Sequence, residues 1–446
     1  MTAIAGMNAP NSSNQVYRML NEMSHRGSAG QLTNETEKST LGLAWTKYQT
    51  GVDKEFSEND LARDFTNDNQ FTLAYFTPNG FFIKRDPFGI SPLYYGWDKD
   101  NHFIFASEMK GLLPFTRQIH EFPPGAIYND SEMVPYFNLV NKPAIDKTPE
   151  IIALTLKSFL QKSVKKQITG DEIGVWLSGG LDSSIMAALA RPLVGHLHTF
   201  SVGMVNSPDL QAARSLSMVL DSIHHERIVQ PEDLKNGLYQ VIFHLESFDP
   251  FLVRSSLLNF ILGKMSSEYQ PDILTGEGSD ELFAGYPYLK SYQTDDLADE
   301  LITIIRQLHN TALQRVDRCS SSFEIRAHVG FLDMDLVNFA IQIPVDYKIY
   351  QGTEKWILRQ AMKGLLPDEV LNRKKAKFWE GGGVNDIILN FAEQFVSDHD
   401  FNQQKVRQSG LKINSKEEML YYRIFCDHFG EFDDYSWMGR TKIHEI

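Results

Sequence analysis

The stretch Ser178-Gly179-Gly180-Leu181-Asp182-Ser183-Ser184 predicts the fold of this chain more directly than any other. It follows the apolar run 173–177 and precedes the apolar run 185–190, which is the order strand, glycine turn, helix. Its two glycines let the backbone approach a ligand closely. The N–H groups of the turn and of the first helical residues then form a cradle for an anion.

The polar side chains of this stretch, the 178–184 loop, favour a phosphate ligand. Ser178, Ser183 and Ser184 offer hydroxyl donors, and Asp182 can hold a divalent cation beside phosphate. The loop lacks the Gly-Lys-Ser/Thr ending of the usual P-loop. A solvent-exposed glycine–serine turn is the alternative, but the full motif after an apolar strand argues against it. The loop resembles the pyrophosphate loop of enzymes that cleave ATP between the α- and β-phosphates.

Composition restricts the class of protein. A chain of 446 residues is too long for one core, so two or three domains are expected. The net charge of −14 disfavours nucleic-acid binding, which needs a basic face. Two cysteines, Cys319 and Cys426, do not make a disulfide framework, so a cytoplasmic location is expected. The sequence has no run of 18 apolar residues and no signal-peptide pattern, so no membrane association is expected.

Residues 1–140 are expected to form a β-rich domain. The runs 71–76 and 80–84 flank the turn Thr77-Pro78-Asn79, and the runs 93–97 and 102–106 flank a second polar turn. A polar linker follows, and Thr148-Pro149-Glu150 opens a helix. The expected apolar face of that helix consists of Ile151, Ile152, Leu154, Phe159, Leu160 and Val164.

Strands and helices alternate from residue 148 onward. Expected strands cover 172–177, 198–202, 225–229 and 273–275, and Ser207 is expected to cap the helix after Pro208. This alternation predicts a doubly wound parallel sheet with ligands at the carboxyl ends of its strands. After about residue 290 the pattern is mainly helical. The expected fold is therefore α/β with two domains, 1–140 and 148–446.

The last expected strand leads into GEGSDELFAGY at 276–286, which places three acids within five residues. Asp182 and Asp280 would face each other across a nucleotide and share Mg²⁺ on its phosphates. Solvated turn acids are the alternative, but their position at the carboxyl end of a strand favours a site.

The order of motifs resembles that of glutamine-dependent asparagine synthetases. The similar segments cover nearly all of 148–385 and are SGGLDSS (178–184), HTFSVG (198–203), SPD (207–209), HHE (224–226), Arg254, GEGSDELFAGY (276–286), FLD (331–333), EKWILR (354–359), Leu366-Pro367 and RKKAKF (373–378). The chain is identified on these motifs as a member of the asparagine synthetase and β-lactam synthetase superfamily.

The resemblance implies a chemistry and its residues. ATP adenylates a substrate carboxylate, pyrophosphate leaves, and ammonia or an amine attacks the activated carbonyl. The residues implied for ATP and pyrophosphate are Ser178, Gly179, Gly180, Asp182, Ser183, Ser184, Val202 and Gly276, with Mg²⁺ on Asp182 and Asp280. Glu277 is implied as a base or amine orienter, and Lys375 as the cation that meets developing charge on the oxyanion. Lys374 and Lys377 are expected on the surface.

The amino-terminal region resembles the Ntn-hydrolase-like glutaminase domain of that family, through RDPFGISPLYY (85–95), FASEMK (105–110) and PPG (123–125). Working domains begin Met-Cys-Gly-Ile, whereas this chain begins Met-Thr-Ala-Ile. The Asn-Gly-Glu turn that binds glutamine is missing as well. Thr2 is a conceivable N-terminal nucleophile, but the lost contacts favour a degenerate domain that serves as a scaffold, an arrangement similar to β-lactam and carbapenam synthetases.

The expected acceptor pocket also departs from the family. Phe251 and Leu252 replace two hydroxyl residues, while Arg254 is retained and can pair with a substrate carboxylate. Arg326 replaces an acid and His328 replaces a basic residue upstream of Phe331-Leu332-Asp333. His328 is either a substrate contact or a core histidine with satisfied hydrogen bonds.

The favoured reading is therefore an amide-forming ligase that uses ATP, Mg²⁺ and ammonia or an amine, without glutamine, on a carboxylate other than aspartate. An ammonia-dependent asparagine synthetase and a nucleotide-binding scaffold are the alternatives. The changes at Phe251, Leu252, Arg326 and His328 argue against the first alternative, and the intact 178–184 loop argues against the second. The sequence does not determine the substrates, the oligomeric state, for which a homodimer is one option, or whether the new bond closes a ring.

Overall fold

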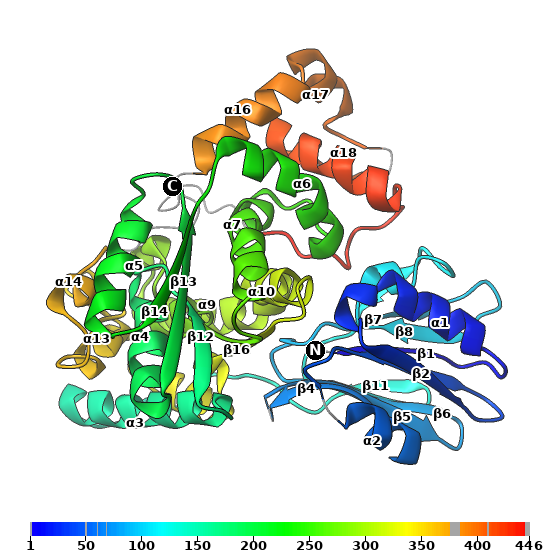
Figure 1. Ribbon diagram of the computed structural model, residues 1–446, viewed down its shortest axis with the longest axis horizontal. Coiled ribbons are helices and arrows are strands. Elements are labelled where there is room, and N and C mark those ends of the chain that lie inside the picture. The colour runs from blue at the N-terminus through cyan, green and yellow to red at the C-terminus, as the bar shows by residue number, and fades with distance from the viewer. Residues whose placement is uncertain are drawn as a thin grey trace.

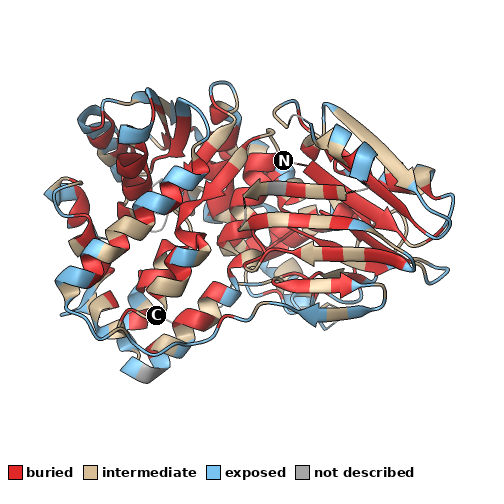
Figure 2. Cartoon of the chain, turned by 90° about the horizontal axis from the view of Figure 1, so that it is seen from below, coloured by how far each residue is buried: buried red, intermediate tan, exposed pale blue. Residues whose placement is uncertain are grey.

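The computed structural model describes residues 2–49, 51–59, 61–67, 69–374, 384–407 and 410–441. These residues form an amino-terminal β domain and a larger α/β domain that lie side by side (Figure 1). Buried residues follow the strands and the inner faces of the helices in both parts (Figure 2). Among the described residues, no helix is both long and apolar enough to cross a lipid bilayer.

The amino-terminal domain contains two antiparallel sheets. The first has the order β2 (Gly30–Glu35), β3 (Thr40–Trp45), β1 (Thr2–Met7), β8 (Phe103–Ala106), β7 (Tyr94–Trp97) and β9 (Ile119–Glu121). The second has the order β11 (Glu132–Pro135), β10 (Ala126–Asn129), β6 (Gly80–Arg85), β5 (Gln70–Thr77) and β4 (Leu61–Asn67). The two expected hairpins are confirmed as β5–β6 and β7–β8.

Apolar side chains from both sheets fill the space between them. Ile4 and Phe105 of the first sheet and Phe81 and Ile83 of the second belong to one fully buried cluster. Helix α1 (Ser13–Glu22) covers the first sheet with Val16, Met19 and Leu20, and α2 (Val52–Asn59) packs beside β4. Strands β1 and β3 are buried along almost their whole length, because α1 covers one face of the first sheet and the second sheet covers the other.

The α/β domain is built on a parallel sheet, which confirms the expected doubly wound arrangement. Its order is β14 (Ile223–Ile228), β13 (His196–Gly203), β12 (Glu172–Trp176), β15 (Asp272–Thr275) and β16 (Arg326–Val329). From β12 the chain adds β13 and β14 on one side of the sheet, and it then returns to add β15 and β16 on the other side. The switch point of the sheet therefore lies between β12 and β15. Ligands bind at such points in open α/β sheets.

Helices cover the sheet and extend beyond it. They are α3 (Pro149–Gln167), α4 (Leu181–Ala190), α5 (Pro208–Val219), α6 (Pro231–Leu245), α7 (Pro250–Ser266), α8 (Ser279–Phe283), α9 (Thr294–Arg306), α10 (Ala312–Ser321), α11 (Met334–Ala340), α12 (Val345–Lys348), α13 (Trp356–Ala361), α14 (Asp368–Leu371), α16 (Asn385–Phe395), α17 (Asp398–Gln404) and α18 (Lys416–Phe429). A short hairpin, β17 (Ile349–Tyr350) and β18 (Thr353–Glu354), precedes α13. The last three helices lie at the end of the molecule far from α3, where α16 and α18 pack on α6 (Figure 1).

The expected apolar face of α3 is only partly correct. Ile152, Leu160 and Val164 are buried, whereas Ile151 and Leu154 are 49% and 71% exposed. The buried stripe continues instead through Leu156, Ser163 and Gln167, which share one face at helical spacing. Thr148 makes no side-chain cap bond, but Ser207 caps α5 as expected by accepting from the N–H of Leu210.

Candidate active site

Two loops meet at the carboxyl edge of the sheet, on either side of its switch point. The 178–184 loop follows β12, and the segment 276–281 follows β15. They are in close contact, because a Cβ atom at Gly276 would lie 2.9 Å from the Cβ of Asp182 and from the N of Ser183. Glycine at this position therefore allows the two loops to share one site.

The 178–184 loop is organised by its own hydroxyl groups. Ser178 Oγ and Ser183 Oγ are 3.1 Å apart, and Ser184 Oγ donates to the carbonyl oxygen of Gly180 at 2.6 Å. Gly179 has a φ of +70°, and a Cβ there would lie 2.6 Å from Ala212 on α5. The loop thus has the tight glycine turn at a helix N-terminus that an anion cradle requires.

Asp182 and Asp280 converge on one cation, as the sequence predicts, but that cation is a lysine ammonium. Lys355 Nζ lies 2.7 Å from both Oδ1 and Oδ2 of Asp182 and 2.7 Å from Oδ1 of Asp280. Ser279 Oγ also donates to Asp182, at 2.7 Å. Two carboxylates and nearby hydroxyl oxygens are a donor set that suits Mg²⁺, so these residues fit the implied metal.

A cavity of about 1370 Å³ opens beside these carboxylates. It is larger than the 300–1,000 Å³, roughly, of most small-molecule sites. Most of the residues that the sequence assigns to the site line it, namely Ser178, Gly180, Asp182, Ser183, Val202, Phe251, Leu252, Gly276, Glu277 and Asp280. Gly179 packs against α5 instead, and Ser184 donates a hydrogen bond within the loop. The geometry can therefore hold a nucleotide together with a second substrate.

Glu277 has an ionic partner that sequence reasoning missed. Arg315 of α10 donates from Nη2 to Glu277 Oε1 at 2.5 Å and from Nη1 to Ser255 Oγ at 3.1 Å. All three residues line the cavity. Burial opposes the charge on Arg315, but Glu277 outweighs it and raises the pKa of the guanidinium. The local sequence offers no signal for this contact, since α10 reaches the site only through tertiary packing.

A further acid, Glu281, lies deeper in the wall of the cavity. The hydroxyl of Tyr286 donates to its Oε1 at 2.5 Å. Burial, followed by the negative charge of Asp280, raises the pKa of the Glu281 carboxyl. The three acids of the segment 276–281 therefore occupy different environments: Glu277 pairs with Arg315, Asp280 with Lys355, and Glu281 with a tyrosine hydroxyl.

Arg254 does not lie where the sequence places it. Its Nε donates to Glu417 Oε1 at 2.5 Å and its Nη1 to Asn385 Oδ1 at 2.8 Å. It is absent from the described residues that line the cavity, although its helical neighbours Phe251 and Leu252 are among them. The guanidinium is instead committed to a buried glutamate on α18, which replaces the expected contact with a substrate carboxylate.

Arg326 and His328 are also outside the part of the cavity wall that the structure describes. Arg326 Nη2 and His328 Nε2 contact Asp272 at 2.6 Å and 2.8 Å, and His328 Nδ1 lies 3.0 Å from Gln167 Oε1. Burial alone would raise the pKa of Asp272, but His328 and Arg326 lower it to about 2. Of the two roles considered for His328, the contacts agree with a core histidine rather than a substrate contact.

The basic segment after α14 reaches the cavity edge. Arg373 donates to the carbonyl oxygen of Ser178 at 3.3 Å and to Asp209 Oδ1 at 2.6 Å. Lys374, expected on the surface, is exposed and also lines the cavity. Lys375 and Lys377 lie outside the described residues, so the role expected of Lys375 stays a prediction.

Thr2 is enclosed by the amino-terminal domain. Its side chain is fully buried, its N–H donates to Asp64 Oδ1 at 3.1 Å, and its hydroxyl donates to the carbonyl oxygen of Arg63 at 2.7 Å. Arg26 Nη1 lies 3.9 Å from Oδ2 of the same aspartate. The backbone N–H and the hydroxyl of Thr2 therefore both bond within the amino-terminal domain.

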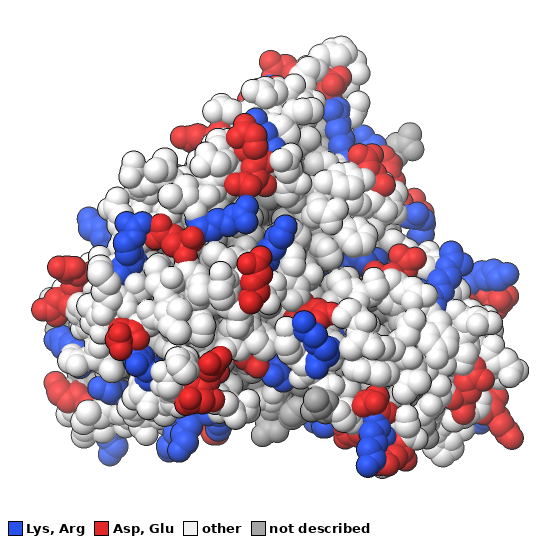
Figure 3. Space-filling view, viewed as in Figure 1, with Lys and Arg blue, Asp and Glu red and all other residues white. Residues whose placement is uncertain are grey.

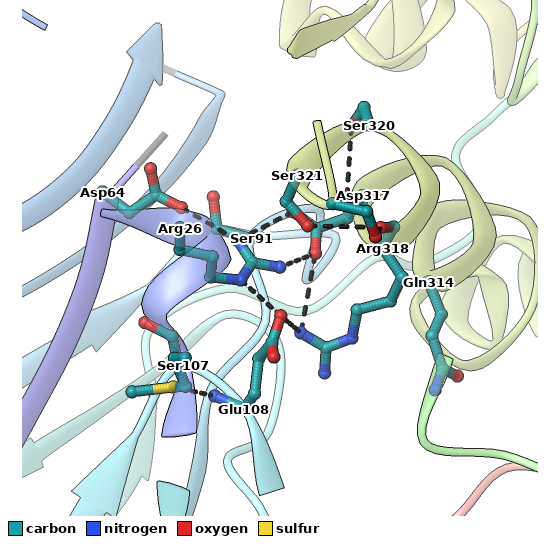
Figure 4. A network of polar contacts seen from close by, with 12 residues as sticks. Arg26, Asp64, Ser91, Ser107, Glu108, Gln314, Asp317, Arg318, Ser320 and Ser321 are labelled. Carbon is teal, nitrogen blue, oxygen red and sulfur yellow. Dashed lines mark hydrogen bonds and ion pairs between the residues drawn. The ribbon is translucent and has the colours of Figure 1, made fainter. Parts of the chain in front are cut away.

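A buried ionic network joins this region to the α/β domain (Figure 4). Arg26 donates to Glu108 Oε1 at 2.5 Å and pairs with Asp317 of α10. Arg318, the next residue of α10, bridges Glu108 and Glu246, each at 2.8 Å. All of these side chains are at most 4% exposed. Helix α10 therefore contacts the other domain through Asp317 and Arg318 and the cavity through Arg315.

Charges on the outer surface do not gather by sign on the face drawn in Figure 3. Lysine and arginine side chains are interspersed there with aspartate and glutamate side chains. The described lining of the cavity also mixes both signs. Its acids are Asp182, Asp209, Glu277, Asp280, Glu281 and Glu354, and its basic residues are Lys290, Arg315, Lys355, Arg359, Arg373, Lys374 and Arg440.

Comparison with known proteins gives consistent matches in both domains. The sequence matches the asparagine synthase family over residues 155–302 and 290–431, and a glutamine amidotransferase domain family over residues 47–114. It is 34% identical over 438 residues to a glutamine-hydrolysing asparagine synthetase of Triphysaria versicolor, covering 90% of this chain and 73% of the relative.

A bacterial relative and a solved structure complete the comparison. Glutamine-hydrolysing asparagine synthetase B of Escherichia coli strain K12 is 32% identical over 420 residues, covering 86% of this chain and 75% of the relative. Among solved structures, NMN synthetase from Francisella tularensis has a TM-score of 0.31 at 14% identity, covering 64% of this chain and 98% of that one. That structural likeness is too low to support an argument.

Proposed function

Because this chain belongs to the asparagine synthase family, whose members carry out ATP-dependent amidation, we propose that it joins a carboxylate to ammonia or an amine through an acyl-adenylate. The observation that carries the proposal is the convergence of Asp182 and Asp280 beside the 178–184 loop, with Glu277 in the same cavity. ATP would be cleaved to AMP and pyrophosphate. The new bond would then form between the activated carbonyl carbon and the nitrogen.

Each part of the site has a role in this scheme. The 178–184 loop binds the pyrophosphate that leaves, and Val202 contacts the adenine. Asp182 and Asp280 would hold Mg²⁺, which would supply charge neutralisation at the phosphates. Glu277 orients the attacking nitrogen or removes its proton. Arg315, which holds Glu277 at 2.5 Å, fixes the direction of that carboxylate.

The nitrogen is proposed to come from free ammonia or an amine rather than from glutamine. Relatives whose names include glutamine hydrolysis are 32–34% identical to this chain. Here, however, Thr2 stands where the family has its cysteine, and both its N–H and its hydroxyl are bonded within the domain. The amino-terminal domain then serves as a support for α10 through the network around Arg26.

The carboxylate is proposed to be larger or more apolar than aspartate. Phe251 and Leu252 line the cavity and cannot donate side-chain hydrogen bonds, so a polar group buried against them would lose about 1–3 kcal/mol. Arg254, Arg326 and His328 are not required by this proposal, because each has a partner outside the cavity.

The deciding experiment measures AMP and pyrophosphate release over pairs of carboxylates with ammonia, primary amines or glutamine. Release of AMP with ammonia or an amine, but not with glutamine, supports the proposal, and ADP as the main product overturns it. Asparagine formation from aspartate and ammonia at ordinary enzyme rates would support the ammonia-dependent asparagine synthetase instead. No nucleotide turnover with any pair, despite nucleotide binding, would favour the scaffold.

A further inference from the structure

One lysine occupies the position between the two carboxylates proposed to bind Mg²⁺. Lys355 Nζ lies 2.7 Å from Asp182 Oδ1 and 2.7 Å from Asp280 Oδ1, so a single ammonium bridges the two loops. The lysine side chain is 3% exposed, and the two aspartates are 16% and 15% exposed. The positive charge is therefore held inside the site rather than at its mouth.

The local backbone is arranged to deliver this ammonium. Lys355 has a φ of +55°, a left-handed conformation that is uncommon for residues other than glycine. Its stem passes over Gly285, where a Cβ atom would lie 2.2 Å from Lys355 Cε and 1.9 Å from Asp280 Oδ1. Both the unusual turn at Lys355 and the absence of a side chain at Gly285 are needed for the bridge.

Electrostatics explains why a cation is needed there. Two carboxylates that converge on one point repel each other, and burial makes the repulsion stronger than in water. A bridging cation removes that cost. An ammonium and a divalent metal ion between the two carboxylates would leave one uncompensated positive charge in a buried site, unless the phosphates of a nucleotide compensate for it.

We propose that Lys355 is a stand-in cation that keeps Asp182 and Asp280 in a metal-binding arrangement while the nucleotide site is empty, and that it excludes a free divalent ion until nucleotide arrives. The proposal rests on the metal role assigned above to these two aspartates. It makes Lys355 a positioning residue for the metal site, and it couples metal binding to nucleotide binding.

The first test measures binding of Mn²⁺ alone by electron paramagnetic resonance, without nucleotide. Lys355→Met removes the ammonium and retains the length of the side chain, so its Mn²⁺ affinity should rise roughly tenfold or more over that of the wild type. Lys290→Met is the matched control, because Lys290 lines the same cavity but pairs with Glu354 and is 39% exposed. The control should bind Mn²⁺ as the wild type does. Unchanged or weaker binding by Lys355→Met overturns the proposal.

The second test measures thermal stability in the presence of a chelator and does not depend on catalysis. Lys355→Met should melt several degrees below the wild type, and either Mg²⁺ or the second substitution Asp182→Asn should restore most of the loss. Equal destabilisation with and without Mg²⁺, and no rescue by Asp182→Asn, would mean that Lys355 only packs in the core. The first test measures metal binding and the second measures stability, and neither measures catalysis. Their failure would therefore not contradict the proposed ligase activity.

Discussion

Arg315 and Glu277 form an ion pair in the wall of the cavity, with Nη2 and Oε1 2.5 Å apart. The guanidinium is anchored a second time by Ser255 Oγ at 3.1 Å. The Glu277 carboxylate in the cavity wall is therefore fixed by an arginine from a helix that also contacts the amino-terminal domain. This arrangement gives Glu277 a defined direction before substrate binds.

Glu277→Gln is expected to slow amide formation by roughly 10²–10³ while leaving the fold and most of the affinity for ATP intact. The amide retains the size of the side chain but has no charge to orient or deprotonate an amine. Amide formation is measured by mass spectrometry and adenylation by ATP–pyrophosphate exchange. An equal loss in both assays would contradict a role limited to nitrogen attack.

Arg254→Met is expected to affect stability much more than catalysis. The substitution leaves Glu417, 1% exposed, without its bidentate partner, and the cost of breaking a buried pair is about 3–5 kcal/mol. The free energy of unfolding is measured by urea denaturation, and the KM for the carboxylate substrate by steady-state kinetics. The double variant Arg254→Met with Glu417→Gln should recover much of the stability. A large rise in KM with unchanged stability would instead indicate that Arg254 contacts the substrate.

Much of the site follows from the sequence because it lies on two short loops whose spacing from their strands is local. The 178–184 loop after β12 and the segment 276–281 after β15 meet because the carboxyl ends of parallel strands share an edge. The position along a strand also explains why Arg326 is not in the acceptor pocket, where the sequence predicts it. Arg326 is the first residue of β16, and a strand advances about 3.3 Å per residue, so it lies roughly 10 Å from the edge that carries the site.

Two cavity residues depend on tertiary packing that no local pattern reveals. Arg315 lies on a polar helix in which any of several charged residues would be expected to face solvent. Lys355 belongs to a recognisable motif, but its approach to Asp182 depends on Gly285 and on a left-handed turn. The apolar face of α3 was misjudged at Ile151 and Leu154 for a similar reason, since burial follows what the helix packs against.

Glutamine is expected not to support amide formation, and glutamate release should stay at background. Thr2 is fully buried, with its N–H on Asp64 and its hydroxyl on the carbonyl oxygen of Arg63. The measurement is glutamate released from glutamine by wild type and by Thr2→Ala, with ammonia as the positive control for amide formation. Release above background that disappears in Thr2→Ala would show that the amino-terminal domain is an active amidase.

Arg26→Met is expected to weaken the contact between the two domains by about 3–5 kcal/mol, because it leaves the buried Glu108 and Asp317 undercompensated. The shift is measured by urea denaturation followed with probes on each domain. Arg214→Met is the control, since Arg214 is 54% exposed and its pair with Glu226 should contribute about 0–1 kcal/mol. Equal effects of the two substitutions would contradict a structural role for the buried network. Activity should fall with the Arg26 variant as well, because α10 carries both Asp317 and Arg315.

Lys375→Ala is expected to lower amide formation by roughly 10²–10³, the amount a preorganised donor contributes where charge develops in the transition state. The neighbouring residues support this expectation. Arg373 bonds the carbonyl oxygen of Ser178, and Lys374 lines the cavity, so the two residues that directly precede Lys375 lie at the edge of the 178–184 loop.

Lys374→Ala is the matched control, one residue away and with the same charge. Lys374 is exposed, so solvent screens its charge and its removal should be mild. The assay follows AMP release and amide product for both variants at saturating ATP, with circular dichroism to confirm folding. An active Lys375→Ala enzyme beside an inactive Lys374→Ala enzyme would move the catalytic role to Lys374. Loss of activity in both variants would mean that the charge of the whole segment, rather than one ammonium, stabilises the transition state.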